Sequence, residues 1–118
     1  MAAHESRLRI SREGPVTQIE FLDRNILDEA NIQAIGEEIG QIIDETGEPK
    51  LLISFSNVDH LSSAALGALI TINKRVNDKA GALRLADIDP QIYEVFTITR
   101  LDKLFQIHEN REDALSSF

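Results

Sequence analysis

The sequence predicts an α/β fold with a mixed, mostly parallel β-sheet of about five strands and about four helices. A short, near-continuous apolar run at residues 50–55 is typical of a central strand that is covered on both faces. Helical and strand patterns alternate after it, and strands separated by helices pair in parallel through right-handed crossovers. A turn at Gly14-Pro15 adds an antiparallel hairpin before them. The predicted sheet is therefore mixed.

A β-hairpin is predicted at the start of the chain. Apolar residues alternate weakly over residues 7–12, and a second apolar segment covers residues 16–22. The Gly14-Pro15 pair between them favours a turn, because glycine allows a positive φ and proline fixes its own φ. The two segments are therefore expected to pair as the first strands of the sheet.

A long helix is predicted over residues 28–46. Asp28 is expected to be its N-cap, since a carboxylate suits the positive end of the helix dipole. Gly47 is expected to end it. One apolar stripe repeats at three- and four-residue spacing and comprises Ile32, Ile35, Ile39, Ile42 and Ile43. Gly36 and Gly40 lie on or beside this stripe, where a missing side chain would allow close approach to the sheet.

The central strand is followed by a loop at residues 56–61 and by a second helix. This helix is predicted from Ser62 to Lys79, and Ala80-Gly81 is expected to end it. The residues expected on its buried face are Leu66, Leu69, Ile70, Asn73 and Val76. Alternating apolar residues over 82–86 then predict the next strand.

A third helix, a last strand and a terminal helix complete the predicted fold. Asp89 as N-cap with Pro90 at the first helical position is a strong start signal. The residues expected on the buried side of this helix are Ile92, Val95, Phe96 and Thr99. The last strand is predicted at residues 104–108, and Asn110 is expected to open the terminal helix. That helix is expected to bury Ala114, Leu115 and Phe118.

The bulk composition predicts one domain over residues 1–118, with residues 1–6 flexible. The formal net charge of −8 at pH 7 would repel phosphate backbones and anionic lipid headgroups. The chain has no cysteine, so it can form neither a disulfide nor a cysteine-ligated metal site. No apolar run approaches the roughly 20 residues of a membrane span, and no signal-peptide pattern opens the chain. We therefore expect a soluble, cytoplasmic protein that binds neither nucleic acid nor membranes.

The sequence predicts no catalytic, metal or nucleotide site. The serines at Ser62 and Ser63 lack the flanking glycines of a nucleophile elbow, and nothing orients His60 as their base. His4, His60 and His108 lie apart, without the spacing of metal ligands. No glycine-rich phosphate loop is present. We therefore expect no enzyme activity, no cofactor and no metal.

The serine pair stands where a buried strand leads into a helix, a junction at which α/β proteins often display chemistry. One interpretation is structural: Ser62 caps the helix, and Ser63 is a small residue in its first turn. The other is functional: the Ser63 hydroxyl at the positive helix end accepts a phosphate, which adds about −1.5 to −2 of charge. The small neighbours Ala64, Ala65 and Gly67 would leave room for a partner's surface.

This stretch resembles the STAS domain of anti-sigma factor antagonists. In that family a strand is followed by Asp-Ser-Ser/Thr-Gly-Leu-Gly at the start of a helix, and the first serine after the aspartate is phosphorylated. Here Ser62 stands at the Asp position, Ser63 at the phosphorylated serine and Ala65 at the first glycine. Leu66 and Gly67 match the residues that follow. Ser62 and Ala65 are thus two departures from the family pattern.

The resemblance runs from about Asn25 to Phe118. Leu27-Asp28 resembles the Leu-Asp of the family's first helix, with Asn25 in place of a glycine. Ala80-Gly81 resembles the family's Gly-Gly turn. A Pro-led helix followed by Leu and Phe also matches, at Asp89-Pro90, Ile92, Val95, Phe96, Leu101 and Phe105. The resemblance implies a STAS-like single domain.

The resemblance also implies a partner-switching mechanism. An unphosphorylated antagonist of this kind binds an anti-sigma factor that is also a serine kinase of the histidine-kinase-like ATPase superfamily, and so frees the sigma factor. The kinase then phosphorylates the serine, here Ser63 with Ser62 as a competing acceptor, and a PP2C-type phosphatase resets the protein. The expected partner-binding residues are Asp28, Asp59, His60, Ser62, Ser63, Ala64, Ala65 and Gly67.

Two other functions remain open on the sequence. The departures at Ser62 and Ala65 permit a STAS module that acts as an unswitched scaffold or assembly subunit. Stable higher oligomers that are insensitive to substitution of Ser63 would favour that function. STAS folds have also been adapted to ligands, so a ligand-sensing module is the third hypothesis, and thermal stabilisation by nucleotides would support it.

Overall fold

A mixed five-stranded sheet forms the centre of the protein in the computed structural model, which describes residues 8–26 and 29–118. Its strands, in the spatial order β1-β2-β4-β6-β7, are β1 (Leu8–Glu13), β2 (Val16–Phe21), β4 (Lys50–Ser54), β6 (Ala82–Ala86) and β7 (Gln106–His108). The pair of β1 and β2 is antiparallel, and the other neighbouring pairs are parallel. The expected hairpin and the mixed, mostly parallel sheet are therefore confirmed.

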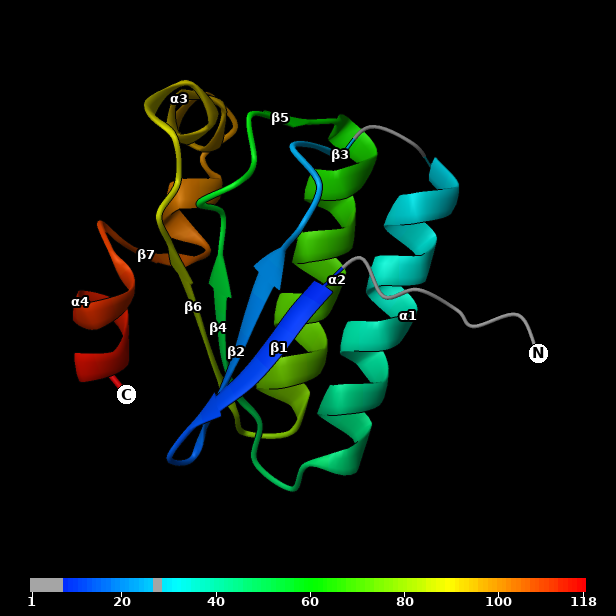
Figure 1. The fold of residues 1–118 in the computed structure, drawn as a ribbon, viewed down its shortest axis with the longest axis vertical. Helices are drawn as coiled ribbons and strands as arrows, with labels where there is room; N and C mark the ends of the chain where they lie inside the picture. The colour runs from blue at the N-terminus through cyan, green and yellow to red at the C-terminus, as the bar shows by residue number, and fades with distance from the viewer. Residues whose placement is uncertain (1–7, 27–28) are drawn as a thin grey trace.

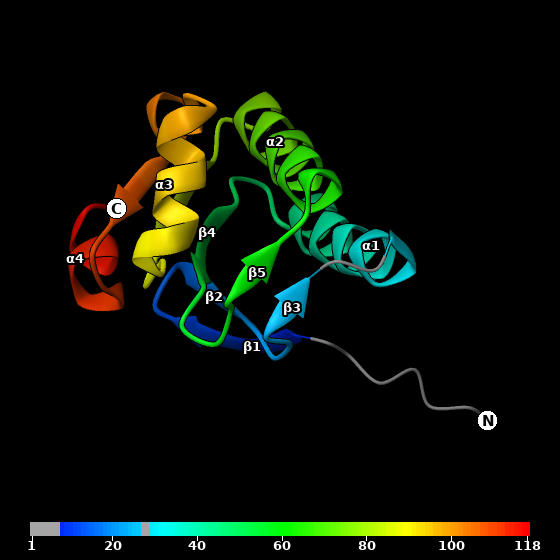
Figure 2. The same ribbon diagram turned by 90° about the horizontal axis from the view of Figure 1, so that it is seen from above.

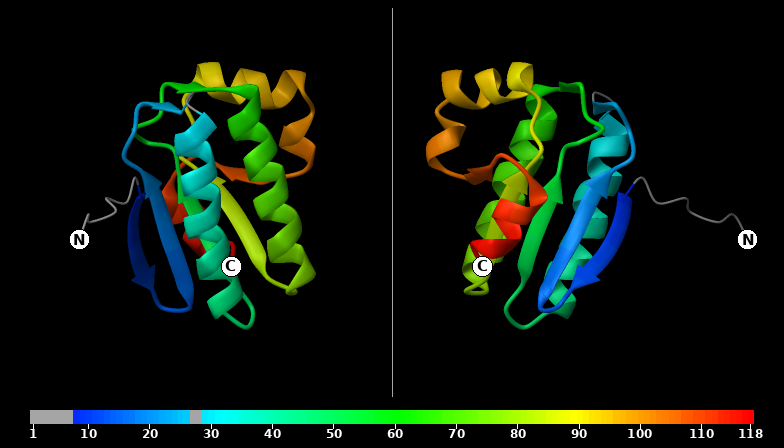
Figure 3. Two further views of the ribbon diagram at one scale, coloured as in Figure 1. Left: turned by 90° about the vertical axis from the view of Figure 1, so that its right-hand side faces the viewer. Right: turned by 60° about the vertical axis from the view of Figure 1, so that its left-hand side comes forward.

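Four α-helices surround the sheet in the described part of the chain. They are α1 (Glu29–Glu45), α2 (Ser63–Asp78), α3 (Pro90–Ile98) and α4 (Arg111–Ser116), and a 3-10 helix, η1 (Leu101–Lys103), follows α3. Figure 1 shows α1 and α2 side by side on one face of the sheet and α4 on the opposite face. Figure 3 shows α3 lying across the end of the sheet to which β4 points. The predicted α/β class is thus confirmed.

One apolar core lies between the sheet and the pair of helices α1 and α2. Successive strand residues point to opposite faces, so every second residue of a strand faces these helices. Ile19 of β2, Ile53 of β4 and Leu85 of β6 are fully buried in this way. Ile39 and Ile43 of α1 pack against them, as the isoleucine stripe predicts.

Four phenylalanines extend the core from the sheet to α3. The ring centroids are 5.2 Å apart for Phe21 and Phe55, 6.5 Å for Phe55 and Phe96, and 5.9 Å for Phe96 and Phe105. Tilted and edge-to-face pairs at such distances are favourable. Phe96 therefore fixes α3 against the carboxyl end of β4.

Three predicted core positions are wrong, because Ile70, Val95 and Thr99 are exposed. Ile70 of α2 is exposed because it lies beside the buried stripe, which continues through Leu69, Ile72 and Asn73. Val95 of α3 is 40% exposed. The reason is that α3 rests on the core through a narrow stripe, Ile92 and Phe96, and Val95 lies beside this stripe.

The last strand is shorter than predicted. Arg100 adopts a left-handed conformation (φ 64°) after α3, and η1 then occupies residues 101–103, so β7 begins at Gln106. Leu104 consequently lies outside the strand and is exposed. The predicted N-cap Asp28 lies outside the described residues.

The structure adds a two-stranded sheet that the sequence pattern does not predict. β3 (Asn25–Ile26) pairs in parallel with β5 (His60–Leu61), which lies inside the expected loop at residues 56–61. Figure 2 shows these two strands side by side, with β5 running into α2. The residues just before α2 are therefore held by hydrogen bonds rather than by a free loop.

Polar contacts join α1 and α2 near their carboxyl ends. One nitrogen of Arg75 donates to both carboxylate oxygens of Asp44, at 2.9 and 3.0 Å, and Lys79 Nζ donates to a main-chain oxygen in the last turn of α1 at 2.8 Å. A Cβ on Gly40 would overlap the Arg75 guanidinium. Gly40 therefore makes room for α2 rather than for the sheet, whereas Gly36 faces open space.

The turn after α2 brings two distant segments into contact. Ala80, rather than Gly81, adopts the left-handed conformation, with φ 56°. The N–H of Ala82 donates to the carbonyl oxygen of Pro49 at 2.8 Å. A Cβ on Gly81 would overlap that same oxygen. The turn therefore requires glycine at position 81 because a Cβ has no space there. Its φ is not in the left-handed region, so backbone conformation is not the reason.

Arg84 fastens the carboxyl end of the chain to the opposite face of the sheet. Its Nε donates to Ser117 Oγ at 2.8 Å, and its guanidinium carbon lies 4.9 Å from the centre of the Phe118 ring. Burial lowers the pKa of Arg84 below its usual value, because loss of water disfavours the charged form. On the same face, Ser54 Oγ donates to the Asp87 carboxylate at 2.8 Å.

Candidate functional site

The serine pair lies at the start of α2. Ser62 has an extended backbone (φ −84°, ψ 167°), and its Oγ accepts a hydrogen bond from the N–H of Ala65 at 3.1 Å. Its carbonyl oxygen accepts from the N–H of Leu66 at 3.1 Å. These are the features of an N-cap residue, so the structure confirms that Ser62 caps α2.

The hydroxyl of Ser63 is exposed and unengaged. It forms no hydrogen bond with any residue that the structure describes. The N–H groups of Ser63 and Ala64, in the first turn of α2, also lack a partner within residues 8–26 and 29–118. Free N–H groups at the positive end of a helix favour a negative charge beside them. A group added to Ser63 would therefore leave the helix cap intact.

Ser62→Ala is expected to lower the free energy of unfolding by about 1 kcal/mol, because the N–H of Ala65 loses its partner. Ser62→Asp supplies an acceptor again and is expected to retain most of the stability. Urea unfolding measures both, with Ser63→Ala as the matched control, since that hydroxyl has no partner among the described residues. Equal stability of Ser62→Ala and the wild type would contradict the cap.

A short ladder fixes the residues just before α2. The carbonyl oxygen of Arg24 accepts from the N–H groups of Asp59 at 2.7 Å and His60 at 3.2 Å. The Arg24 guanidinium also pairs with the Asp59 carboxylate at 2.8 Å. His60 Nδ1 lies 2.8 Å from Asn25 Oδ1, within hydrogen-bond distance. Asp59 and His60 are thereby held in one arrangement.

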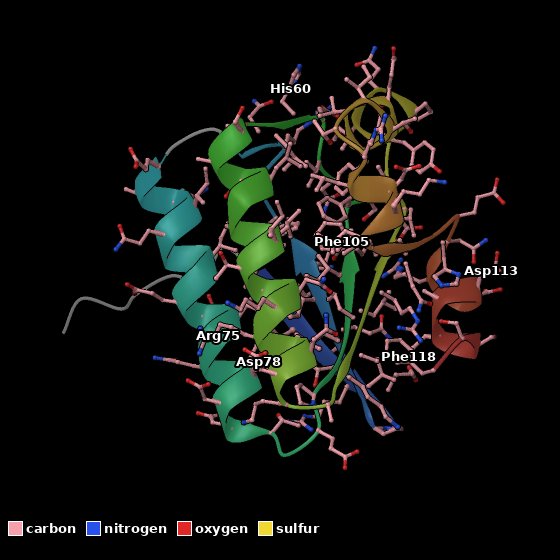
Figure 4. All side chains as sticks on the ribbon, turned by 180° about the vertical axis from the view of Figure 1, so that it is seen from behind. His60, Arg75, Asp78, Phe105, Asp113 and Phe118 are labelled. Carbon is pink, nitrogen blue, oxygen red and sulfur yellow. The ribbon has the colours of Figure 1, made fainter. Side chains whose placement is uncertain are left out.

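The side chains of Asp59 and His60 remain accessible to a partner. Figure 4 shows His60 at the end of the molecule where α2 begins, pointing outward. The ion pair of Arg24 and Asp59 reaches solvent, and such surface pairs contribute about 0–1 kcal/mol to stability. A partner could therefore displace either side chain at little cost.

The small residues of the predicted site divide into two groups. Ala64 and Gly67 are exposed, whereas Ala65 is 5% exposed and faces the core. Ala65 lines a small apolar cavity of about 20 Å³ together with Phe21 and Leu61. The expectation that Ala65 contacts a partner is therefore corrected: its side chain packs inside the protein, because the third helical position of α2 points toward the sheet.

A groove of about 200 Å³ lies between β5 and α3. Its lining residues are Asp59, His60, Leu61, Gln91, Ile92 and Val95. The groove adjoins the serine pair, since Leu61 directly precedes Ser62. Farther along α3, Ile98 is 73% exposed. The sequence does not predict this groove, because Val95 has the helical spacing of a buried residue and that spacing is the same for a groove wall.

The described residues provide no metal site and no membrane span. Among residues 8–26 and 29–118, no group of three or more His, Cys, Asp or Glu side chains could hold a metal ion. No described helix has the length and apolar character needed to cross a bilayer. The predicted site residue Asp28 lies outside this part of the chain, so its position relative to Ser63 stays a prediction.

The chain matches the family model of the STAS domain over residues 24–114. A similar relative is BtrV, a candidate anti-sigma factor antagonist of Bordetella bronchiseptica. It is 26% identical over 95 residues, which cover 80% of this chain and 81% of BtrV.

Solved structures share this fold. A STAS domain anti-sigma factor antagonist of Planctomyces limnophilus has a TM-score of 0.84 at 23% identity, over 93% of this chain and 96% of that chain. The Bacillus cell fate determinant SpoIIAA, in its phosphorylated form, has a TM-score of 0.70 at 15% identity, over 93% of this chain and 97% of that chain. At such identities these structures show the fold alone. Together with the family match, they confirm the expected fold, and the chain belongs to the STAS domain family.

Proposed function

We propose that this chain is an anti-sigma factor antagonist of a partner-switching pathway, regulated by phosphorylation of Ser63. Unphosphorylated, it binds an anti-sigma factor that is also a serine kinase of the histidine-kinase-like ATPase superfamily, and the sigma factor is released. The kinase uses ATP to phosphorylate Ser63, and the two proteins separate. A PP2C-type phosphatase removes the phosphate and restores binding. The protein acts in the cytoplasm as a binding protein, not as an enzyme.

The state of the Ser63 hydroxyl carries this proposal. It is exposed at the first position of α2 and has no hydrogen-bond partner among the described residues. The Ser62 hydroxyl, by contrast, is bound to the N–H of Ala65. A kinase could therefore modify Ser63 with the cap in place, whereas modification of Ser62 would disturb it. The phosphorylated form of SpoIIAA, which shares the fold, supports a switch of this kind.

The proposed contact surface surrounds Ser63. Its described residues are Asp59, His60, Ser62, Ser63, Ala64 and Gly67, and we propose that Asp28 also contacts the partner. The groove between β5 and α3 continues this surface, and its apolar wall of Leu61 and Val95 could accept an apolar side chain of the partner.

The departure at Ser62 is compatible with the switch. An aspartate and a serine both serve as N-caps by accepting from an N–H in the first turn, and Ser62 does so at 3.1 Å. A phosphate on Ser63 would therefore meet a neutral neighbour instead of a carboxylate. This geometry favours a retained switch over an unswitched scaffold.

Incubation with the cognate kinase and ATP is expected to place a phosphate on Ser63, located by mass spectrometry of peptides. Ser63→Ala is expected to abolish the modification, and Ser62→Ala, the matched neighbour, to retain it. A phosphate on neither serine would overturn the proposed switch. Stable higher oligomers whose formation is unchanged by substitution of Ser63 would support the scaffold function instead.

A further inference from the structure

A polar pocket of about 300 Å³ lies at the opposite end of α2 from the serine pair. It is bounded by the last turns of α2, the start of β6 and the segment from η1 to β7. Its side-chain lining includes Asn73 and Asn77 of α2, Gln106 of β7, and Leu104. Figure 4 shows Arg75 and Asp78 on these last turns of α2, far from His60 at the other end. The pocket is therefore separate from the proposed contact surface.

Asn73 is the unusual residue of this pocket. It lies on the core-facing side of α2 and is 8% exposed. Its carboxamide makes no hydrogen bond within the described residues, yet its atoms are not sealed from solvent. An amide removed from water without a partner destabilises a protein. A leucine at this position would fill the buried face of α2 without a polar group. Packing alone therefore does not explain why a carboxamide stands here and opens into the pocket.

The side chains that line the pocket are mostly uncharged, and carboxamides prevail among the polar ones. Three carboxamides meet there, from Asn73, Asn77 and Gln106, and each offers both a donor and an acceptor. Arg84 also borders the pocket, but its guanidinium is bound to Ser117 at 2.8 Å. No carboxylate borders the pocket. Such a lining suits a ligand with a neutral donor–acceptor pair better than a cation.

The short last strand keeps this pocket open. β7 pairs only with residues 84–86 of β6, so the first two residues of β6 are not covered by β7. Leu104, which precedes the strand, is exposed at the rim and offers an apolar contact. The pocket therefore combines planar hydrogen-bonding groups with an apolar edge, as small-molecule sites commonly do.

We propose that this pocket binds a neutral molecule that presents an amide-type donor and acceptor on one planar edge. Peptide carboxamides and cyclic amides share this chemistry. The site goes beyond the proposed switch: ten residues of α2, or about 15 Å along the helix, separate Asn73 from Ser63. The proposed pocket therefore uses none of the residues of the surface around Ser63.

The test is a titration of the ¹⁵N-labelled full chain followed by NMR, because the side-chain NH₂ signals of the three carboxamides report directly on the pocket. The probes are N-acetylglutamine methylamide and uracil, and benzoate serves as a planar anion without an amide. At least one amide probe is expected to shift the NH₂ signals of Asn73, Asn77 and Gln106 in a saturable way, with a dissociation constant on the order of 1 mM. The probe that shifts these signals shows whether the ligand's amide group belongs to a peptide carboxamide or to a cyclic amide.

Variants decide whether the shifts come from this pocket. Asn73→Leu is expected to weaken binding at least about tenfold, and Gln106→Leu, at an exposed position that does not threaten folding, is expected to weaken it as well. Gln41→Leu, on the exposed side of α1, is the matched control and should bind as the wild type does. The proposal is overturned if neither amide probe shifts the three signals, if benzoate shifts them equally, or if both pocket variants bind normally.

Discussion

Phosphorylation of Ser63 is expected to weaken binding of the anti-sigma factor by more than about a hundredfold, which corresponds to about 3 kcal/mol. The phosphate adds about −1.5 to −2 of charge at an interface built around small side chains, on a protein that is already acidic. Repulsion and the cost of desolvating the phosphate both act in the complex and not in the free protein. Isothermal titration calorimetry with the phosphorylated and unphosphorylated forms measures the difference.

Three substitutions make this test specific. Ser63→Asp carries about half the charge of a phosphate and is expected to weaken binding at least about tenfold. Ser11→Asp adds the same charge on the exposed strand β1 and is expected to leave binding unchanged. Ser63→Ala should bind as the wild type does. Equal affinity of the phosphorylated and unphosphorylated forms would refute the switch.

Gly81→Ala is expected to destabilise the protein by about 3 kcal/mol. The added Cβ would overlap the carbonyl oxygen of Pro49, a main-chain atom that cannot move without displacing the start of β4. The same oxygen accepts from the N–H of Ala82, so any shift also weakens that hydrogen bond. Thermal unfolding followed by circular dichroism is expected to show a melting temperature lower by roughly 10 °C.

Gly36→Ala is the matched control, with an effect of opposite sign. A Cβ on Gly36 meets nothing within 4 Å, and this residue lies in the interior of α1. Replacing a helical glycine by alanine there is expected to stabilise the protein by about 0.5–1 kcal/mol. If Gly81→Ala unfolds at the same temperature as the wild type, the close approach of Pro49 does not constrain this turn.

The long elements of the fold could be predicted because each repeats its pattern several times. The isoleucine spacing in α1 and the Asp89-Pro90 start of α3 are local signals, and both elements stand where these signals place them. Side-chain burial is less local. Val95 follows the helical spacing of a buried residue, but it faces a groove, because burial depends on what α3 meets in three dimensions.

The two-residue strands could not be predicted for a different reason. A periodic pattern needs several residues, and β3 and β5 have two each. The residues that pair between these two strands lie 35 positions apart in the chain, as Asn25 and His60 do. At the site itself, the N-cap at Ser62 could be predicted from residue type alone. The burial of Ala65 could not, because it depends on how α2 is rotated against the sheet.

The ladder between β3 and β5 has a consequence for the rate of association. Fixing the backbone of one loop residue costs about 1–2 kcal/mol of conformational entropy, and here Arg24 already holds Asp59 and His60 before any partner arrives. A surface ordered in advance gives up less freedom on binding. Encounter then requires no slow rearrangement of this segment, so we expect association to be limited by diffusion and orientation rather than by ordering of a loop.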